Sequence, residues 1–188
     1  MVANLPPGGF TYIATGDVNN DGWSDLVFSV EQQASHAYVL LNNQRGGFTQ
    51  VPTSFGGRTT EAVLTDLNGD GDLDLIMDSL VYLGNGKGEF TFKTTLSFNA
   101  GVQFGFNVVS DVNGDGIPDV EYLASNSVAI FLGKGDGTFQ TPYFVGAGPS
   151  PGSLLAANVH GQAGGTGLSI LLLPDQQGGV FTILNLTK

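Results

Sequence analysis

Residues 61–90, EAVLTDLNGDGDLDLIMDSLVYLGNGKGEF, contain most of a unit that recurs along the chain. An apolar run precedes the Asp- and Gly-rich loop DLNGDGDLD (66–74). Two further apolar runs follow, and then a glycine turn that ends in an aromatic residue. Short runs of apolar and β-branched residues between such turn signals predict β-strands. The unit therefore predicts three short strands and the beginning of a fourth.

The unit occurs three times in intact form, with matching loops DVNNDGWSD (17–25) and DVNGDGIPD (111–119). The first aspartates of the loops are 49 and then 45 residues apart, and a degenerate fourth copy places Asn158 a further 47 residues on. We expect one repeat domain over residues 1–188, with repeats at about 6–54, 55–99, 100–146 and 147–188. The last repeat is degenerate and is expected to lack its outer strand.

This periodicity predicts an all-β fold, a β-propeller of four-stranded blades. One such meander buries only part of its faces, whereas stacked blades bury them all and leave short edges. No segment has the apolar period of a capped helix, so essentially no helix is expected. A β-sandwich is the less favoured alternative, because sandwiches rarely have such regular copies. About four repeats could form a complete small propeller, a part-propeller or half of an oligomeric propeller.

Composition narrows the possible functions. The net charge is −11 and the six basic residues are scattered, which argues against nucleic acid, because phosphate binding needs clustered Lys and Arg. With no cysteine, disulfides and zinc–thiolate sites are excluded. No stretch is apolar for long enough to form a membrane helix, and no signal peptide is visible. Ten of the 17 acidic residues lie in the three loops, so the acidity is local.

Each intact loop concentrates oxygen atoms at fixed positions. Positions 1, 3, 5 and 9 supply side-chain oxygens and position 7 a backbone carbonyl. Five or six hard oxygens in a flexible turn suit Ca²⁺ better than Mg²⁺, which demands a tighter octahedron. Soft transition metals would favour His or Cys, which the loops lack. We therefore predict about three Ca²⁺ ions, with these ligands: Asp17, Asn19, Asp21, Trp23 (backbone O) and Asp25 in site 1; Asp66, Asn68, Asp70, Asp72 (backbone O) and Asp74 in site 2; Asp111, Asn113, Asp115, Ile117 (backbone O) and Asp119 in site 3.

A glycine at position 6 (Gly22, Gly71 and Gly116) permits the sharp reversal that turns the oxygens inward. An EF-hand is excluded because its position-12 glutamate and flanking helices are missing. An acidic turn without metal is the alternative, but turn chemistry explains the Gly and Asn and not three aligned acidic sets. In the fourth copy Asn158, His160 and Gln162 replace the ligands, so no Ca²⁺ is expected there.

The unit D-[VL]-N-x-D-G-x-x-D, followed by an apolar strand and a G-x-G-x-F turn, resembles the FG-GAP/VCBS repeat found in integrin α-subunit propellers. The resemblance covers nearly the whole chain and is specific in three of its four repeats. It implies a Ca²⁺ loop between the first two strands of each blade, an extracellular or cell-surface location and a binding role. Such propellers commonly have more blades than this chain has repeats, so a homo-oligomer that completes the propeller is one expectation.

The resulting functional hypothesis is a non-enzymatic, calcium-stabilised binding or adhesion module for protein ligands. A lectin-type propeller that binds glycans, or a structural scaffold within a larger secreted protein, are the alternatives. An enzyme is not expected, because the two histidines, His36 and His160, have no nucleophile or acid–base partner in their sequence context. Neither nucleic-acid binding nor membrane insertion is expected.

Overall fold

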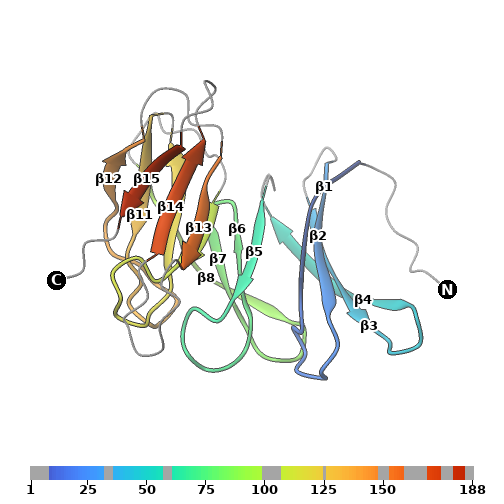
Figure 1. Cartoon of the computed structure of the whole chain (residues 1–188). Coiled ribbons are helices and arrows are strands. Elements are labelled where there is room, and N and C mark those ends of the chain that lie inside the picture. The colour runs from blue at the N-terminus through green and yellow to red at the C-terminus, as the bar shows by residue number, and fades with distance from the viewer. Residues whose placement is uncertain are drawn as a thin grey trace. The chain divides into compact units, whose positions relative to one another are not determined.

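The computed structural model describes residues 9–31, 36–56, 61–98, 107–124, 126–147, 153–158, 169–174 and 180–184. The chain divides into two compact units, Met1–Thr95 and Leu96–Lys188, and each is considered by itself. All regular elements in the described ranges are β-strands, as predicted (Figure 1). No helix among these residues is long and apolar enough to cross a membrane.

The first unit contains two four-stranded antiparallel sheets in which consecutive strands pair. The first sheet contains β1 (Gly9–Gly16), β2 (Asp25–Glu31), β3 (His36–Asn42) and β4 (Phe48–Gly56). The second contains β5 (Ala62–Thr65), β6 (Asp74–Met77), β7 (Leu80–Gly84) and β8 (Phe90–Thr95). The second unit contains a third sheet of the same order: β9 (Asn107–Ser110), β10 (Asp119–Ala124), β11 (Ser127–Phe131) and β12 (Tyr143–Gly146). It also has a three-stranded sheet: β13 (Leu155–Asn158), β14 (Ser169–Pro174) and β15 (Val180–Leu184).

The core of the first unit lies between its two sheets. Val27 and Val39 of the first sheet and Leu75 of the second are completely buried and belong to one hydrophobic cluster. Phe55 meets Tyr82 edge to face, with ring centroids 5.0 Å apart. Full burial of each aliphatic side chain contributes about 1.5–3 kcal/mol. Sheet stacking therefore explains why all four residues of β6 are buried, although a one-sided strand would alternate.

The second unit follows the same rule. All six residues of β10 are buried. Leu123 and Ile130 pack with Leu154, which immediately precedes β13, on one side of the third sheet. Edge-to-face aromatic contacts form a further apolar cluster in this unit, with Phe98 and Tyr122 at a centroid separation of 5.0 Å. The outer strand β12 is mostly exposed.

Candidate calcium-binding loops

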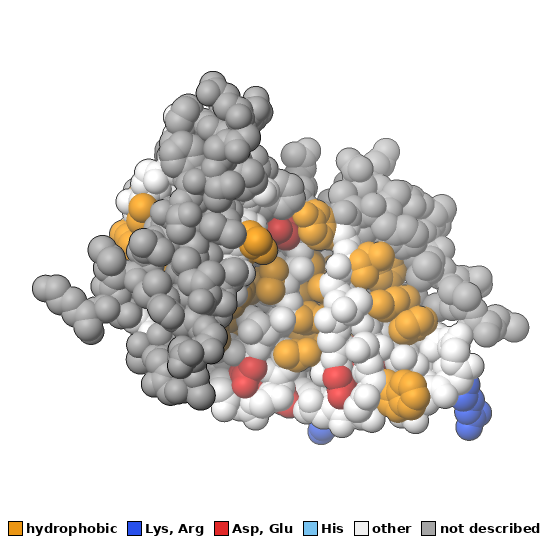
Figure 2. Space-filling view, viewed as in Figure 1, with side chains coloured by type: hydrophobic (Ala, Val, Ile, Leu, Met, Phe, Trp, Pro, Cys, Tyr) orange, Lys and Arg blue, Asp and Glu red, His pale blue; other side chains and the backbone are white. Residues whose placement is uncertain are grey.

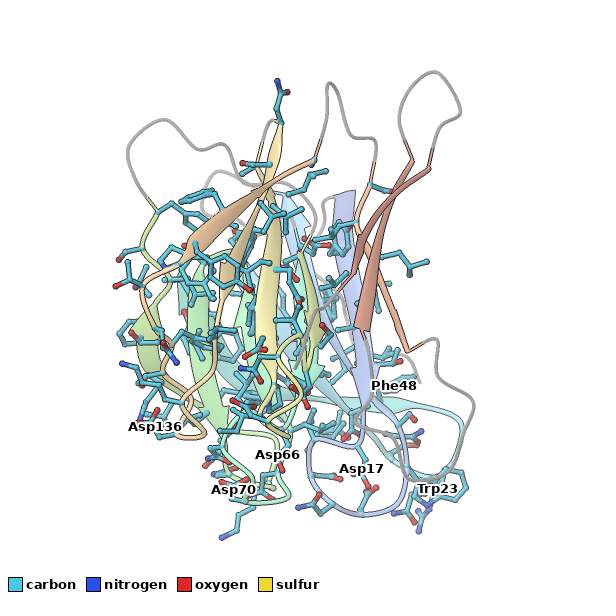
Figure 3. The ribbon with its side chains drawn as sticks, turned by 60° about the vertical axis from the view of Figure 1, so that its left-hand side comes forward. Asp17, Trp23, Phe48, Asp66, Asp70 and Asp136 are labelled. Carbon is cyan, nitrogen blue, oxygen red and sulfur yellow. The ribbon has the colours of Figure 1, made fainter. Side chains whose placement is uncertain are left out.

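Each intact loop connects the first two strands of its sheet: β1 to β2, β5 to β6, and β9 to β10. In the first unit both loops lie at the same end of their sheets, where Figure 3 shows Asp17 of one loop and Asp66 of the next. Figure 2 shows acidic side chains along this lower edge of the first two sheets. The predicted site residues at positions 1 to 7 lie in these loops, whereas the position-9 aspartates, Asp25, Asp74 and Asp119, are the first residues of β2, β6 and β10.

The aspartate at position 1 closes each loop on itself. Gly22 N donates to Asp17 Oδ2 at 2.7 Å, across five residues. The matching bonds are 2.9 Å in the second loop and 2.8 Å in the third. The glycines that donate them have φ angles of 86°, 90° and 83°, for Gly22, Gly71 and Gly116. These angles lie in the left-handed region, so position 6 requires the glycine that the sequence analysis assigned to it.

Positions 3 and 5 form a second recurring arrangement. In loop 2, Asp70 N donates to Asn68 Oδ1 at 3.0 Å, and Asn68 Nδ2 donates back to Asp70 Oδ2 at 2.8 Å. The residue at position 7 donates its backbone N–H to the aspartate at position 5, as Asp72 N does to Asp70 Oδ1 at 2.9 Å. The other two loops repeat all three bonds at 2.8 to 3.2 Å, with Asn19, Asp21, Trp23, Asn113, Asp115 and Ile117 in these positions.

Position 9 has a role that the sequence analysis did not identify. Asp74 has no exposed surface, and its carboxylate accepts Leu67 N at 2.8 Å and Gly84 N at 2.9 Å. Asp25 and Asp119 are equally buried and make the equivalent pairs of bonds. The carboxylate thus joins the start of its loop to the end of the third strand of the sheet. We call this two-ended contact the position-9 bridge.

Burial changes the acidity of the position-9 residues. It raises the pKa of Asp25 and of Asp74, and it raises that of Asp119 to about 6, while the backbone donors act in the opposite direction. The nearby aspartates at positions 1 and 5 raise it further by charge repulsion. A cation in the loop would reverse that last effect, because it would favour the ionised form.

The donor chemistry of each loop fits Ca²⁺: three carboxylates, one amide oxygen and a backbone carbonyl, all hard oxygens. The carboxylates, however, are turned toward backbone N–H groups. Among the described residues, no three His, Cys, Asp or Glu side chains converge as a metal site. The fifteen ligand assignments stay predictions.

The tryptophan in loop 1 has its side chain directed outward. Trp23 is 51% exposed, in contrast to the partly buried residues Asp72 and Ile117 at the same loop position. Figure 3 shows Trp23 at the tip of its loop. The exposed indole presents a flat apolar surface within an acidic loop.

A buried glutamate in the third sheet was also missed by the sequence analysis. Glu121 lies on β10 with no exposed surface, at the position that Val27 and Ile76 occupy in the first two sheets. Ser110 Oγ donates to Glu121 Oε1 at 2.5 Å, while Oε2 has no hydrogen-bond partner in the described structure. Burial raises the pKa of Glu121 to about 8. Its charge and spacing, two residues after Asp119, were the signals available in the sequence.

The fourth, degenerate loop lies largely outside the described residues. Asn158 ends β13, whereas His160 and Gln162 fall in the part of the chain for which no placement is given. The expectation that this copy binds no Ca²⁺ stays a prediction.

Comparison with known proteins agrees with the repeat. Residues 17–77 and 111–161 match the FG-GAP-like repeat family. A search of curated proteins finds no match. Among solved structures, a lectin of Agrocybe aegerita, described as specifically recognising non-reducing terminal N-acetylglucosamine, superposes with a TM-score of 0.68 at 20% identity. The match covers 94% of this chain and 50% of the lectin, so this chain spans about half the lectin's length. The likeness shows that the sheets are blades of a β-propeller.

A second solved structure is more distant. The pore of the Photorhabdus luminescens Tc holotoxin matches with a TM-score of 0.49 at 23% identity, over 87% of this chain and 8% of that chain. At this level of similarity it adds nothing to the fold assignment.

Proposed function

Since this chain belongs to the FG-GAP-like repeat family, we propose that it is a calcium-stabilised, non-enzymatic β-propeller binding module for a protein ligand, working outside the cytoplasm. The propeller blades are the binding scaffold, and each metal loop stiffens one end of its own blade. One observation carries the calcium assignment: each of the three loops has the same pattern of hydrogen bonds to its aspartates at positions 1, 5 and 9.

The clustered carboxylates of the loops repel one another, and a bound cation would neutralise them. Ten of the 17 acidic residues lie in the three loops, and the chain has a net charge of −11. Three Ca²⁺ ions contribute +6, which changes the formal charge from −11 to −5. In each loop the carboxylates at positions 1 and 5 and the amide oxygen at position 3 would hold the ion. The position-9 carboxylate would connect it to the sheet.

The expected affinity favours an extracellular setting. Extracellular calcium modules typically bind with Kd values of about 10⁻⁴–10⁻³ M. At about 2 mM Ca²⁺, each occupied loop then stabilises the fold by roughly 0.6–1.8 kcal/mol. A non-enzymatic role follows from the sparse chemistry outside the loops: the sequence has no cysteine and only two histidines. Repeated aspartates are better used as ligands than as an acid–base pair.

A glycan ligand is the second candidate, and Trp23 favours it. The indole is 51% exposed in loop 1, where it could stack on a sugar face. The Agrocybe aegerita lectin, which has the same fold, is described as recognising a terminal sugar. Glycan-array binding that is lost in Trp23→Ala would favour a lectin, and an array without hits would favour a protein ligand.

The calcium assignment is tested by thermal unfolding in about 2 mM CaCl₂ and in EDTA. Wild type is expected to melt several degrees higher with Ca²⁺, because about 1 kcal/mol corresponds to roughly 2–4 °C in a chain of this size. Asp70→Ala, which disables one of the three loops, should reduce that gain by at least about a third. Asp136→Ala is the matched control: it removes the same charge from an exposed turn outside the three loops, where Asp136 accepts a bond from Thr138 N. A calcium gain that is absent from wild type, or reduced equally by both variants, would refute the assignment.

A further inference from the structure

Loops 1 and 2 differ from the repeat consensus at two positions that contact each other. At position 4, loop 1 has Asn20 where the other loops have Gly69 and Gly114. At position 7, loop 2 has Asp72, whereas the other loops have apolar side chains. Asn20 Nδ2 donates to Asp72 Oδ1 at 2.6 Å, across 52 residues of sequence. This bond joins one predicted calcium loop directly to the next.

Asn20 occupies a backbone conformation that favours glycine. Its φ angle is 57°, close to the 76° and 77° of Gly69 and Gly114. Asparagine tolerates the left-handed region better than other residues with a Cβ, although less well than glycine. Its side chain compensates by binding the neighbouring loop, which a glycine could not do.

The surroundings keep this pair in place. A Cβ added to Gly86, in the turn between β7 and β8, would overlap Asp72 Oδ1 and would lie 2.6 Å from Asn20 Nδ2. The same turn bonds to loop 1 through its backbone, because Gly88 N donates to Val18 O at 2.9 Å. Loop 1, loop 2 and this turn therefore form one interlocked group within the first unit.

We propose that Asn20 is a positioning residue that couples calcium binding in loop 1 to calcium binding in loop 2. This inference rests on the proposed calcium-stabilised function. Asn20 lies between the predicted ligands Asn19 and Asp21, and Asp72 is itself a predicted ligand through its backbone. Ordering one loop around an ion restricts the hydrogen-bonded partner in the other loop. The second ion then binds to a loop that has already lost part of its conformational freedom.

The coupling is positive and moderate. A single hydrogen bond of this kind contributes the equivalent of about a three- to tenfold change in affinity. By linkage, each loop should change the affinity of the other by the same factor. Loop 3 has Gly114 at position 4 and Ile117 at position 7, so it lacks both side chains of this pair and should bind its ion without such a link.

Trp23 makes the test specific to one loop, because it is the only tryptophan and lies within loop 1. Its fluorescence is followed during Ca²⁺ titration, with calorimetric titration of the same variants as a second measure of affinity. Asp70→Ala, which abolishes calcium binding by loop 2, is expected to raise the calcium concentration at the midpoint of loop 1 binding about three- to tenfold. Asp115→Ala, which abolishes calcium binding by loop 3, should leave that midpoint unchanged.

The decisive comparison uses Asn20→Gly, which installs the residue found in the other loops and preserves the positive φ. In this background, Asp70→Ala should no longer move the loop 1 midpoint. The coupling is refuted if Asp70→Ala has no effect in wild type, if Asp115→Ala has the same effect, or if the shift persists in the Asn20→Gly background. No calcium binding by wild type would instead refute the proposed function itself.

Discussion

The position-9 bridge predicts that the buried aspartate of a loop stabilises the fold even without calcium, whereas an exposed aspartate of the same loop does so mainly when calcium is bound. Asp74→Ala removes a buried carboxylate that accepts two backbone N–H groups, from Leu67 and Gly84. Each N–H group left buried without an acceptor costs about 1–3 kcal/mol, which gives about 2–6 kcal/mol for the pair. Removing a carboxylate whose pKa is raised by burial recovers part of its desolvation cost. We therefore expect a loss of about 2–4 kcal/mol in the free energy of unfolding, even without calcium.

Asp70→Ala provides the contrast within the same loop. Asp70 is exposed, so water can replace the bonds that its carboxylate accepts from Asp72 N and Asn68 Nδ2. In EDTA, Asp70→Ala should lower the free energy of unfolding by less than about 1 kcal/mol. Asp74→Asn should be intermediate, because the amide retains one acceptor oxygen and presents a donor to the other N–H group.

The assay is equilibrium urea unfolding in EDTA, followed by the fluorescence of Trp23, which lies in the same unit as Asp74. Repeating the series in about 2 mM CaCl₂ separates the calcium-dependent loss, expected for both variants, from the calcium-independent loss, expected mainly for Asp74→Ala. If both variants unfold at the same urea concentration in EDTA, the two backbone bonds contribute nothing measurable and the reasoning is wrong.

Two further predictions concern acidity and space. Burial raises the pKa of Glu121 from 4.5 to about 8, so the folded state retains a proton that the unfolded state has lost; in EDTA, stability should fall as pH rises from about 4.5 to about 8. Glu121→Gln should flatten this slope, as urea unfolding at several pH values would reveal, and an unchanged slope would contradict the assignment to Glu121. A Cβ on Gly84 would overlap the backbone oxygen of Leu73, so Gly84→Ala should cost about 1–3 kcal/mol. A Cβ on Gly146 would have nothing within 4 Å, so Gly146→Ala should change stability little. Equal melting temperatures for the Gly84→Ala and Gly146→Ala variants would contradict the packing argument.

Most of the loop geometry could be predicted from the sequence, because it is local. Most bonds within a loop join residues no more than five apart, as the bond from Gly71 N to Asp66 does, and the longest, from Leu67 N to Asp74, spans seven. Asp, Asn and Gly at fixed spacing dictate such turns wherever they occur. The strands between the loops follow from short apolar runs, and three intact repeats made the propeller the favoured fold.

The burial of Glu121 could not be predicted from the sequence. A glutamate in a strand gives no indication by itself of whether it faces water or a second sheet. Stacking of the third sheet against the segment that leads into β13 buries its neighbours Leu123 and Ile130, and Glu121 is buried on the same strand as Leu123. Its lack of exposure, and hence its raised pKa, depends on that stacking.

The sequence by itself determined the repeat, the strand order within each blade and the oxygen-rich loops, since these depend on neighbours in the chain. Only the tertiary structure decided which aspartates are bridges and which loops are joined. Asp74 meets Gly84 because β6 and β7 pair, and Asn20 meets Asp72 because two sheets stack across 52 residues. Contacts between distant residues depend on how sheets pack, and a local pattern of residue types does not encode that packing.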